Sequence, residues 1–280
     1  MLIFGSSGLG YSITDDSHSP GAEADIFEIE DLLNHEQWNI AERKIVEWLR
    51  SRPGEAGNEV MFYNLGICHY NMGRYEDALD DFEIALLKMK GSPEILENKA
   101  KTLLMMGRTE EAMQTLAEAI ENDKENSTLY KMRGFMHFNN GELKKAKDDF
   151  EQYERLRGGS LQDERPETLV VMARVEVAQG SKERAKELYN LVTERTEDAD
   201  LAMEGLFYFM ANEDDEQTKT LVNKLVRRFP EDGRLYLVSA VLCERAYLHT
   251  EADMNKKIAN QYGIDSQIIE FFIKENLNRK

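Results

Sequence analysis

Apolar and small residues recur at a fixed spacing along the middle of the chain. Gly66, Ala100 and Gly134 stand 34 residues apart from one to the next. Three further sets keep the same spacing: Gly73, Gly107 and Gly141; Ala78, Ala112 and Ala146; and Phe82, Leu116 and Phe150. A constant period of this length indicates a repeated structural unit. Within each unit the apolar residues fall at helical spacing, so the pattern predicts α-helices.

Each repeated unit is expected to contain two helices joined by a tight turn. Gly73 and Gly107 follow the first apolar stretch of their copies, where a helix that ends in a left-handed residue favours glycine. Gly66 and Ala78 are expected where the paired helices approach most closely, since larger side chains would push the backbones apart. In the second helix Ala78 and Phe82 stand at i and i+4, so both face the first helix.

The central copies resemble the tetratricopeptide repeat family in their sequence pattern. That family repeats a helix–turn–helix unit of about 34 residues, marked by an aromatic residue, Leu-Gly, a second aromatic, and later Ala, Phe and Pro. The segments that carry the resemblance are Phe62-Tyr63-Asn64-Leu65-Gly66 and Tyr75-Glu76-Asp77-Ala78-Leu79. The resemblance implies an all-α fold, a right-handed α-solenoid of antiparallel helix pairs with a C-terminal capping helix.

Weaker copies of the pattern flank the three central ones. The upstream copy covers residues 38–53, and the downstream copies cover residues 180–189, 205–230 and 235–248. We therefore expect a solenoid of about six repeats over residues 25–250, with a flexible N-terminal tail at 1–24 and capping helices at 251–280. An insertion breaks the period at residues 158–166, where either a longer ordered loop or a hinge would fit.

The charge of the chain argues against several classes of partner. Its 53 Asp and Glu outnumber its 35 Lys and Arg, which gives a formal net charge of −18 over 280 residues. Such a charge repels phosphates, so binding to nucleic acid or to an anionic membrane surface is not expected. The sequence has neither an apolar run of about 18 residues nor a complete export signal, so we expect no membrane insertion and a cytoplasmic protein.

No constellation of reactive side chains points to catalysis. The histidines include no pair at metal-ligand spacing, and Cys68 and Cys243 are too far apart for a Cys-x-x-Cys site. His69 and His137 occupy the same position two repeats apart, so we expect them to pack within their own repeats. The glycine-rich run at 5–10 lacks the strand and helix of a phosphate-binding loop. We predict no metal, no cofactor and no enzymatic activity.

The resemblance also implies where a partner binds. In the tetratricopeptide repeat family the first helix of each repeat lines a concave groove, and the inward positions here combine apolar, aromatic and charged side chains. The candidate peptide-binding residues are Tyr63, Asn64, Ile67, Tyr70, Asn98, Lys101, Leu104, Lys131, Phe135, Phe138 and Arg174. An apolar and aromatic surface on a highly charged protein typically marks a binding site.

These candidates divide into three expected roles. The aromatic and aliphatic members would supply apolar contacts to a peptide. The two asparagines would hydrogen-bond the peptide backbone, since an amide both donates and accepts, and the lysines and the arginine would contact acidic side chains. For Tyr70 and Phe138 the alternative is burial between repeats, and for the asparagines it is a structural role.

One specialised form of this groove is not expected here. Relatives that hold the acidic C-terminal tail of heat-shock chaperones use Lys, Asn, Asn, Lys and Arg over three successive repeats. The corresponding positions of the central repeats carry Tyr63, Ile67, Asn98, Thr128 and Met132. Without the basic groups a terminal carboxylate has no charged partner, so the sequence does not predict such a carboxylate clamp.

The sequence therefore favours a non-enzymatic protein–protein interaction module, an adaptor, chaperone or assembly factor, that binds a peptide segment in an apolar concave groove. One alternative is a transcriptional regulator, because residues 258–272 fit the spacing of a helix-turn-helix element. Asp265 and Glu270 on its second helix oppose phosphate contacts. An enzyme whose chemistry the sequence hides is the other alternative, and a homo-oligomer formed through the end repeats stays open.

Overall fold

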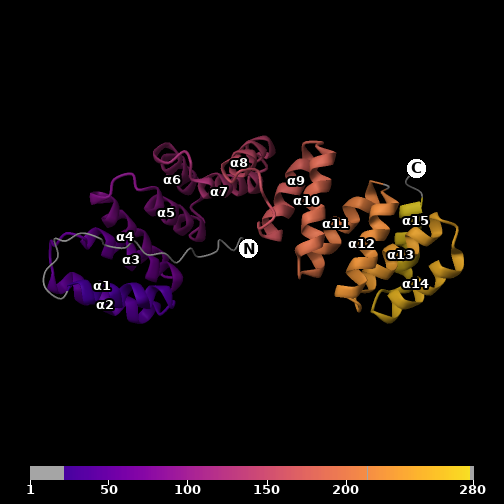
Figure 1. Ribbon diagram of the computed structural model, residues 1–280, viewed down its shortest axis with the longest axis horizontal. Helices are drawn as coiled ribbons and strands as arrows, with labels where there is room; N and C mark the ends of the chain where they lie inside the picture. The colour runs from indigo at the N-terminus through magenta and orange to yellow at the C-terminus, as the bar shows by residue number, and fades with distance from the viewer. Residues whose placement is uncertain (1–21, 213, 278–280) are drawn as a thin grey trace. The chain divides into compact units, whose positions relative to one another are not determined.

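The computed structural model describes residues 22–212 and 214–277, which form fifteen α-helices and no strand (Figure 1). The helices are 12 to 14 residues long and short turns join most of them. Their bounds are α1 (Ala22–Asn34), α2 (Trp38–Ser51), α3 (Asn58–Asn71), α4 (Tyr75–Lys88), α5 (Pro93–Met105), α6 (Thr109–Asn122), α7 (Ser127–Asn139), α8 (Leu143–Leu156), α9 (Pro166–Ala178), α10 (Lys182–Arg195), α11 (Ala199–Ala211), α12 (Asp215–Arg228), α13 (Gly233–Arg245), α14 (His249–Gln261) and α15 (Ser266–Leu277).

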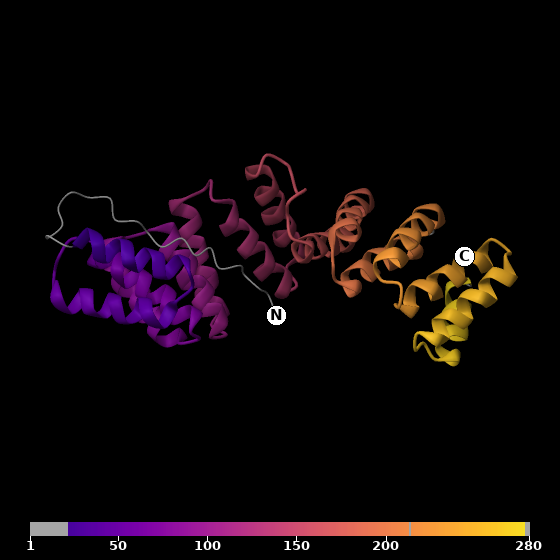
Figure 2. The same cartoon turned by 60° about the horizontal axis from the view of Figure 1, so that its bottom comes forward.

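The chain divides into two compact units, and each is described by itself. Unit 1 contains residues 1–136 and unit 2 contains residues 137–280, so the boundary falls inside α7. Within each unit, helices that follow one another in sequence pack side by side, as α3 with α4 and α13 with α14 (Figure 2). Short turns make the two helices of a pair antiparallel. The expected all-α architecture of stacked helix pairs is confirmed.

Close packing between paired helices depends on Gly66 in α3. A Cβ atom added to Gly66 would stand 2.6 Å from Cε1 of Phe82 in α4, which leaves no room for a methyl group. Ala78, the small residue expected near the same junction, is fully buried in one apolar cluster with Phe82 and Tyr63. The predicted close approach of these two helices is therefore confirmed.

The turn between the first and second helix of a pair also follows the prediction. Gly73 has a φ of 76°, in the left-handed region where a side chain is strained. The next backbone N–H, from Arg74, donates to the carbonyl of His69 at 2.9 Å and closes the end of α3. The same left-handed glycine recurs at Gly107, Gly141 and Gly180.

Unit 1 begins with a helix that lies partly inside the expected tail. The α1 helix starts at Ala22, whereas the expected tail covered residues 1–24, of which 1–21 lie outside the described residues. Ile29 and Leu33 of α1 are buried in one cluster with side chains of α2 and α3. Their spacing of four residues puts them on one face, so α1 completes the first helix pair with α2.

The insertion in unit 2 is a packed loop between α8 and α9. Glu164 is buried and accepts hydrogen bonds from the Tyr153 hydroxyl and from Arg157. Leu161 is also buried, and its carbonyl accepts a hydrogen bond from Arg195 of α10 at 3.3 Å. These contacts favour the ordered loop over the hinge.

The C-terminal end of unit 2 adds one helix to the last pair. Because α14 packs on α13, residues 251–261 belong to that pair and not to a cap over 251–280. The α15 helix packs on both α13 and α14, and its Ile269 and Ile273 are buried. Ile268 and Phe271 of α15 are 57% and 67% exposed. In the described residues α15 is thus the helix that follows the last pair.

Candidate peptide-binding surface

The candidate groove residues lie on the first helices of their pairs, and the unit boundary separates them. Phe138 on α7 and Arg174 on α9 lie in unit 2. The other nine lie in unit 1, on α3, α5 and the part of α7 that ends at Met136. We call these nine the inner stripe: Tyr63, Asn64, Ile67, Tyr70, Asn98, Lys101, Leu104, Lys131 and Phe135.

Two members of the inner stripe, from neighbouring repeats, contact each other. Nδ2 of Asn98 donates one hydrogen bond to the Tyr63 hydroxyl at 2.9 Å and another to the carbonyl of Glu94 at 2.9 Å. The Tyr63 ring packs on Phe82, with 5.9 Å between the ring centroids. Since Asn98 uses its amide hydrogens inside the protein, a partner must bind the carbonyl oxygen of Asn98 or displace one of these bonds.

Asn64 presents the opposite situation. Its side chain is 1% exposed, and within residues 22–212 and 214–277 its Oδ1 accepts no hydrogen bond. A buried amide oxygen without a donor costs about 1–3 kcal/mol, so such an atom in a folded protein needs an explanation. Among the buried side-chain atoms that the structure describes on the inner stripe, it is the acceptor without a donor.

Two of the charged candidates are already paired. Nζ of Lys101 lies 2.6 Å from Oε1 of Glu97, one helical turn away, and both side chains are nearly buried. In unit 2, Arg174 donates hydrogen bonds to both carboxylate oxygens of Glu204 at 2.8 and 2.5 Å, and these bonds raise the pKa of its guanidinium. The expected contacts of Lys101 and Arg174 with an acidic partner would therefore require these pairs to open.

The apolar candidates are buried to different extents. Tyr63, Ile67 and Phe135 are buried, whereas Tyr70 and Leu104 are partly exposed. Leu104 packs on the apolar cluster of α5 and α6. The Tyr70 ring meets Tyr75 edge-on at 5.7 Å, and burial, followed by the nearby Tyr75, raises the pKa of the Tyr70 hydroxyl. In unit 2, Phe138 is partly exposed as well.

Three residues outside the candidate set shape these surfaces. Glu97 and Glu204 neutralise the two cations, and Met105 is 46% exposed beside Leu104 at the end of α5. Glu97 stands four residues before Lys101, a helical spacing that pairs opposite charges and is visible in the sequence. Glu204 stands 30 residues after Arg174, and no local pattern connects the two.

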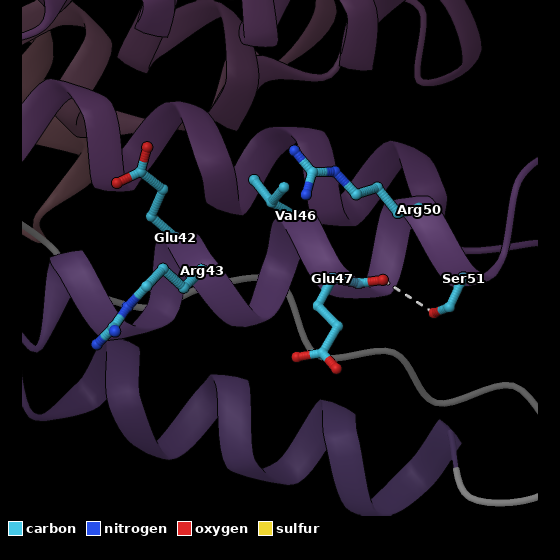
Figure 3. A pocket seen from close by; sticks show the side chains of 6 residues that line it. All are labelled: Glu42, Arg43, Val46, Glu47, Arg50 and Ser51. Carbon is cyan, nitrogen blue, oxygen red and sulfur yellow. Dashed lines mark hydrogen bonds between the residues drawn. The ribbon is translucent and has the colours of Figure 1, made fainter.

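A separate hollow of about 770 Å³ lies along α2 in unit 1. Figure 3 shows the side chains that line it, all from that helix: Glu42, Arg43, Val46, Glu47, Arg50 and Ser51. Its dashed line marks the hydrogen bond from Ser51 Oγ to the carbonyl of Glu47 at 2.9 Å. Acidic and basic side chains alternate along the helix, so the hollow does not attract a ligand of one charge.

The described residues contain no assembled metal site. No group of three or more His, Cys, Asp and Glu in residues 22–212 and 214–277 is placed to hold an ion. Both cysteines are free, and burial raises the pKa of the Cys68 thiol to about 12, far from a reactive thiolate. In that same part of the chain no helix combines the length and the apolar character needed to cross a membrane.

The first half of α15 exposes apolar and acidic side chains. Ile268 and Phe271 are the large exposed side chains in the first half of α15, and the acidic Asp265 and Glu270 lie near them. Phosphate contacts are made by basic and neutral polar groups. The helix-turn-helix alternative thus gains no support from α15.

The sequence of residues 69–133 matches the family model described as tetratricopeptide repeat. No curated protein matches the chain. A tetratricopeptide repeat protein from Parabacteroides merdae has a similar fold at 20% identity and a TM-score of 0.58, over 91% of this chain and 98% of that one. The C-terminal part of a TPR repeat-containing protein from Cytophaga hutchinsonii is similar at 16% identity and a TM-score of 0.66, over 87% of this chain and 98% of that one.

A third similar structure is YrrB, a TPR protein with an unusual peptide-binding site. It has 17% identity and a TM-score of 0.50, over 64% of this chain and 89% of that one. At these identities the likeness shows the fold, which agrees with the paired helices and the left-handed glycines of the turns. Residues 69–133 therefore match the tetratricopeptide repeat family model, and the chain as a whole has the fold of tetratricopeptide repeat proteins.

Proposed function

We propose that the chain is a non-enzymatic adaptor, chaperone or assembly factor that binds an extended segment of a partner protein along the inner stripe of unit 1. The observation that carries the proposal is the buried Oδ1 of Asn64, an acceptor without a donor in the described residues. It lies on the same helix as Tyr63 and Ile67. The atom is shielded from solvent, so the Asn64 side chain has to turn outward before a backbone N–H of an extended peptide can donate to it, while apolar side chains of the peptide contact its neighbours.

The fold supports this proposal. Tetratricopeptide repeats bind protein partners, and YrrB carries a peptide-binding site on the same fold. A preformed helical surface lowers the ordering cost of capturing a flexible segment. Phe138 and Arg174 are proposed as a second contact region, in unit 2.

The accessible members of the surface define the chemistry of the partner. Tyr70, Leu104 and the neighbouring Met105 are the apolar side chains that stay partly or largely exposed. Lys101 is paired with Glu97, so acidic groups have little to bind at this position. We therefore expect a segment with apolar or aromatic side chains. We also propose that the protein works in a reducing cytosol, since Cys68 and Cys243 are both free thiols.

The test compares one substitution at two positions. Leu104→Glu places a charge on the inner stripe, and Leu87→Glu places the same charge at a 70% exposed position of α4 outside the stripe. Wild type and both variants, each checked for helicity by circular dichroism, are used to capture proteins from the native cell extract. A partner identified by mass spectrometry should be retained by wild type and Leu87→Glu and lost by Leu104→Glu. Equal retention by all three would rule out the inner stripe.

Asn64 is then tested with the partner so identified. Asn64→Leu replaces the buried amide by an apolar side chain of similar size. The free protein should be as stable as wild type or more stable, because the unsatisfied oxygen is gone. The dissociation constant of the complex should rise about tenfold if that oxygen accepts a hydrogen bond from the partner. An unchanged dissociation constant would contradict a role of Asn64 in binding.

A further inference from the structure

His69 on α3 joins three helices of unit 1 through its ring. The residue is 6% exposed, and Nδ1 lies 2.6 Å from Oδ2 of Asp81 on α4. Nε2 lies 3.1 Å from Oε1 of Glu42 on α2. Both ring nitrogens therefore face carboxylate oxygens. An ionised carboxylate only accepts hydrogen bonds, so each contact requires an N–H group on the ring, and only the imidazolium has two.

The charges around the ring agree with this state. Glu42 on α2 and Asp81 on α4 face its two nitrogens, and Arg74, in the turn before α4, lies 2.7 Å from the same oxygen of Glu42. Asp77 of α4 pairs with Arg74 at 2.7 Å and so lowers its effect on the ring. Burial disfavours both charged partners and raises the pKa of the Asp81 carboxyl, but at His69 the hydrogen bonds to Asp81 and Glu42 outweigh burial and raise the pKa of the imidazole.

We propose that the charged His69 ring stabilises the packing of the α1–α2 pair on the α3–α4 pair at neutral pH. This packing loosens when the ring loses its proton as the solution becomes alkaline. The proposal does not depend on the function proposed above. It concerns the contacts of His69 with Glu42 and Asp81, whereas the inner stripe uses Tyr63 and Ile67 of the same helix.

The neighbouring bonds decide which contact breaks when the ring loses a proton. Asp81 is nearly buried, and in the described residues its carboxylate accepts from His69 alone. Glu42 also accepts from Arg74 at 2.7 Å. The remaining N–H therefore stays with Asp81, and the lone pair of Nε2 is left against Oε1 of Glu42. The repelling contact is the one to α2, so the α1–α2 pair should loosen first.

The same position two repeats later provides a matched comparison. Nδ1 of His137 lies 2.5 Å from Oε2 of Glu142, and Nε2 lies 3.7 Å from Oδ2 of Asp149. The aspartate stands twelve residues after the histidine in both copies. Glu142 and Asp149 belong to the turn after α7 and to α8, so these contacts stay within one helix pair. Substitution of His137 should therefore leave the α1–α2 pair unchanged.

The first experiment determines the protonation state of His69 in the full chain. Long-range proton–nitrogen spectra of the imidazole rings, assigned with His69→Gln, should show both nitrogens of His69 protonated near pH 7. The ring should lose its proton at a higher pH than in the urea-unfolded chain. A single neutral tautomer near pH 7 would overturn the proposal.

The second experiment uses the tryptophans, because both of them, Trp38 and Trp48, lie on α2. Over the pH range in which His69 loses its proton, the wild-type emission maximum should shift to longer wavelength, with the midpoint of the His69 titration. Backbone amide exchange in α1 and α2, corrected for its intrinsic pH dependence, should rise at least about tenfold.

Two variants distinguish loss of the His69–Glu42 contact from general unfolding. Glu42→Gln keeps an amide that can hydrogen-bond the neutral ring, so the fluorescence shift should disappear while the fold is kept. His137→Gln should shift as wild type does. A wild-type spectrum that stays constant over this range, or a shift that persists in Glu42→Gln, would overturn the proposal.

Discussion

The hydroxyl of Tyr63 accepts a hydrogen bond from Nδ2 of Asn98, 35 residues further along the chain, at 2.9 Å. The bond joins α3 and α5, the first helices of two neighbouring repeats. Around it the contact is apolar, with Tyr63, Phe82 and Ile95 buried in one cluster. This polar link therefore helps fix how one repeat is placed on the next.

Removing that link should weaken unit 1 without changing its packing. Tyr63→Phe keeps the ring on Phe82 and removes the acceptor of Asn98, so the free energy of unfolding should fall by about 1 kcal/mol. Urea unfolding followed by circular dichroism measures the change. Tyr70→Phe, which leaves the bond in place, is the control, and equal losses in both variants would argue against a specific role for the bond.

Gly66 and Phe82 are expected to be energetically coupled. Gly66→Ala places a methyl group 2.6 Å from Cε1 of Phe82 and should lower the free energy of unfolding by about 1–3 kcal/mol. In the next repeat Ala100 replaces Gly66 and Leu116 replaces Phe82. The larger residue at the first position therefore occurs together with a smaller residue at the second. The double variant Gly66→Ala/Phe82→Leu should lose less than the two single variants together. Simple additivity in the double-mutant cycle would contradict the coupling.

The repeated positions could be predicted because the residue type is itself the constraint. Gly73 has a positive φ that side chains avoid, and Gly66 faces Phe82 at a distance that excludes a methyl group. Both requirements are local to one helix pair and return in the following pairs. Periodicity alone therefore located the helices and the turns between them.

The surface chemistry depends on how successive pairs stack, and that could not be predicted. Glu204 of α11 neutralises Arg174 of α9 across 30 residues, and nothing in the spacing of either residue indicates this pairing.

The start of α1 was a different case. The expected solenoid from residue 25 includes Ile29 and Leu33, but residues 22–24 of α1 were assigned to the tail because they carry no repeat position.

Glu164 is expected to hold the loop between α8 and α9. Glu164→Ala removes the buried acceptor of the Tyr153 hydroxyl and of Arg157, so the free energy of unfolding should fall by about 1–3 kcal/mol. Limited proteolysis should cleave faster within residues 157–165. Asp163→Ala is the control, because it removes a carboxylate that contacts Arg157 but is 79% exposed. It should change the free energy of unfolding and the cleavage rate very little. Unchanged proteolysis of Glu164→Ala would mean that Leu161 alone fixes the loop.

Asp232 should make the stability of unit 2 depend on pH on the acid side. Burial disfavours its charged carboxylate, but hydrogen bonds from the side chain and the backbone of Arg234 outweigh burial and lower the pKa of Asp232. Because the folded pKa lies below the unfolded one, the stabilisation is complete above about pH 4 and is lost as the pH falls through the folded pKa. In Asp232→Asn the free energy of unfolding should therefore fall less on acidification than in wild type, by about 1 kcal/mol. An acid limb identical to wild type would contradict this assignment.

The inner stripe is not expected to hold an acidic chain terminus. The Lys101 ammonium already pairs with Glu97 at 2.6 Å, and Met132, at a position where a carboxylate clamp needs a charge, is buried and apolar. Residues 1–136 carry 25 Asp and Glu against 13 Lys and Arg, so an acidic peptide is also repelled at longer range. Peptides that end in several acidic residues, with a free or an amidated terminus, should show the same weak binding by fluorescence anisotropy. A micromolar complex that amidation or Asn98→Ala abolishes would show that the repeats rearrange to form a clamp, since Nδ2 of Asn98 already donates to Tyr63 and Glu94.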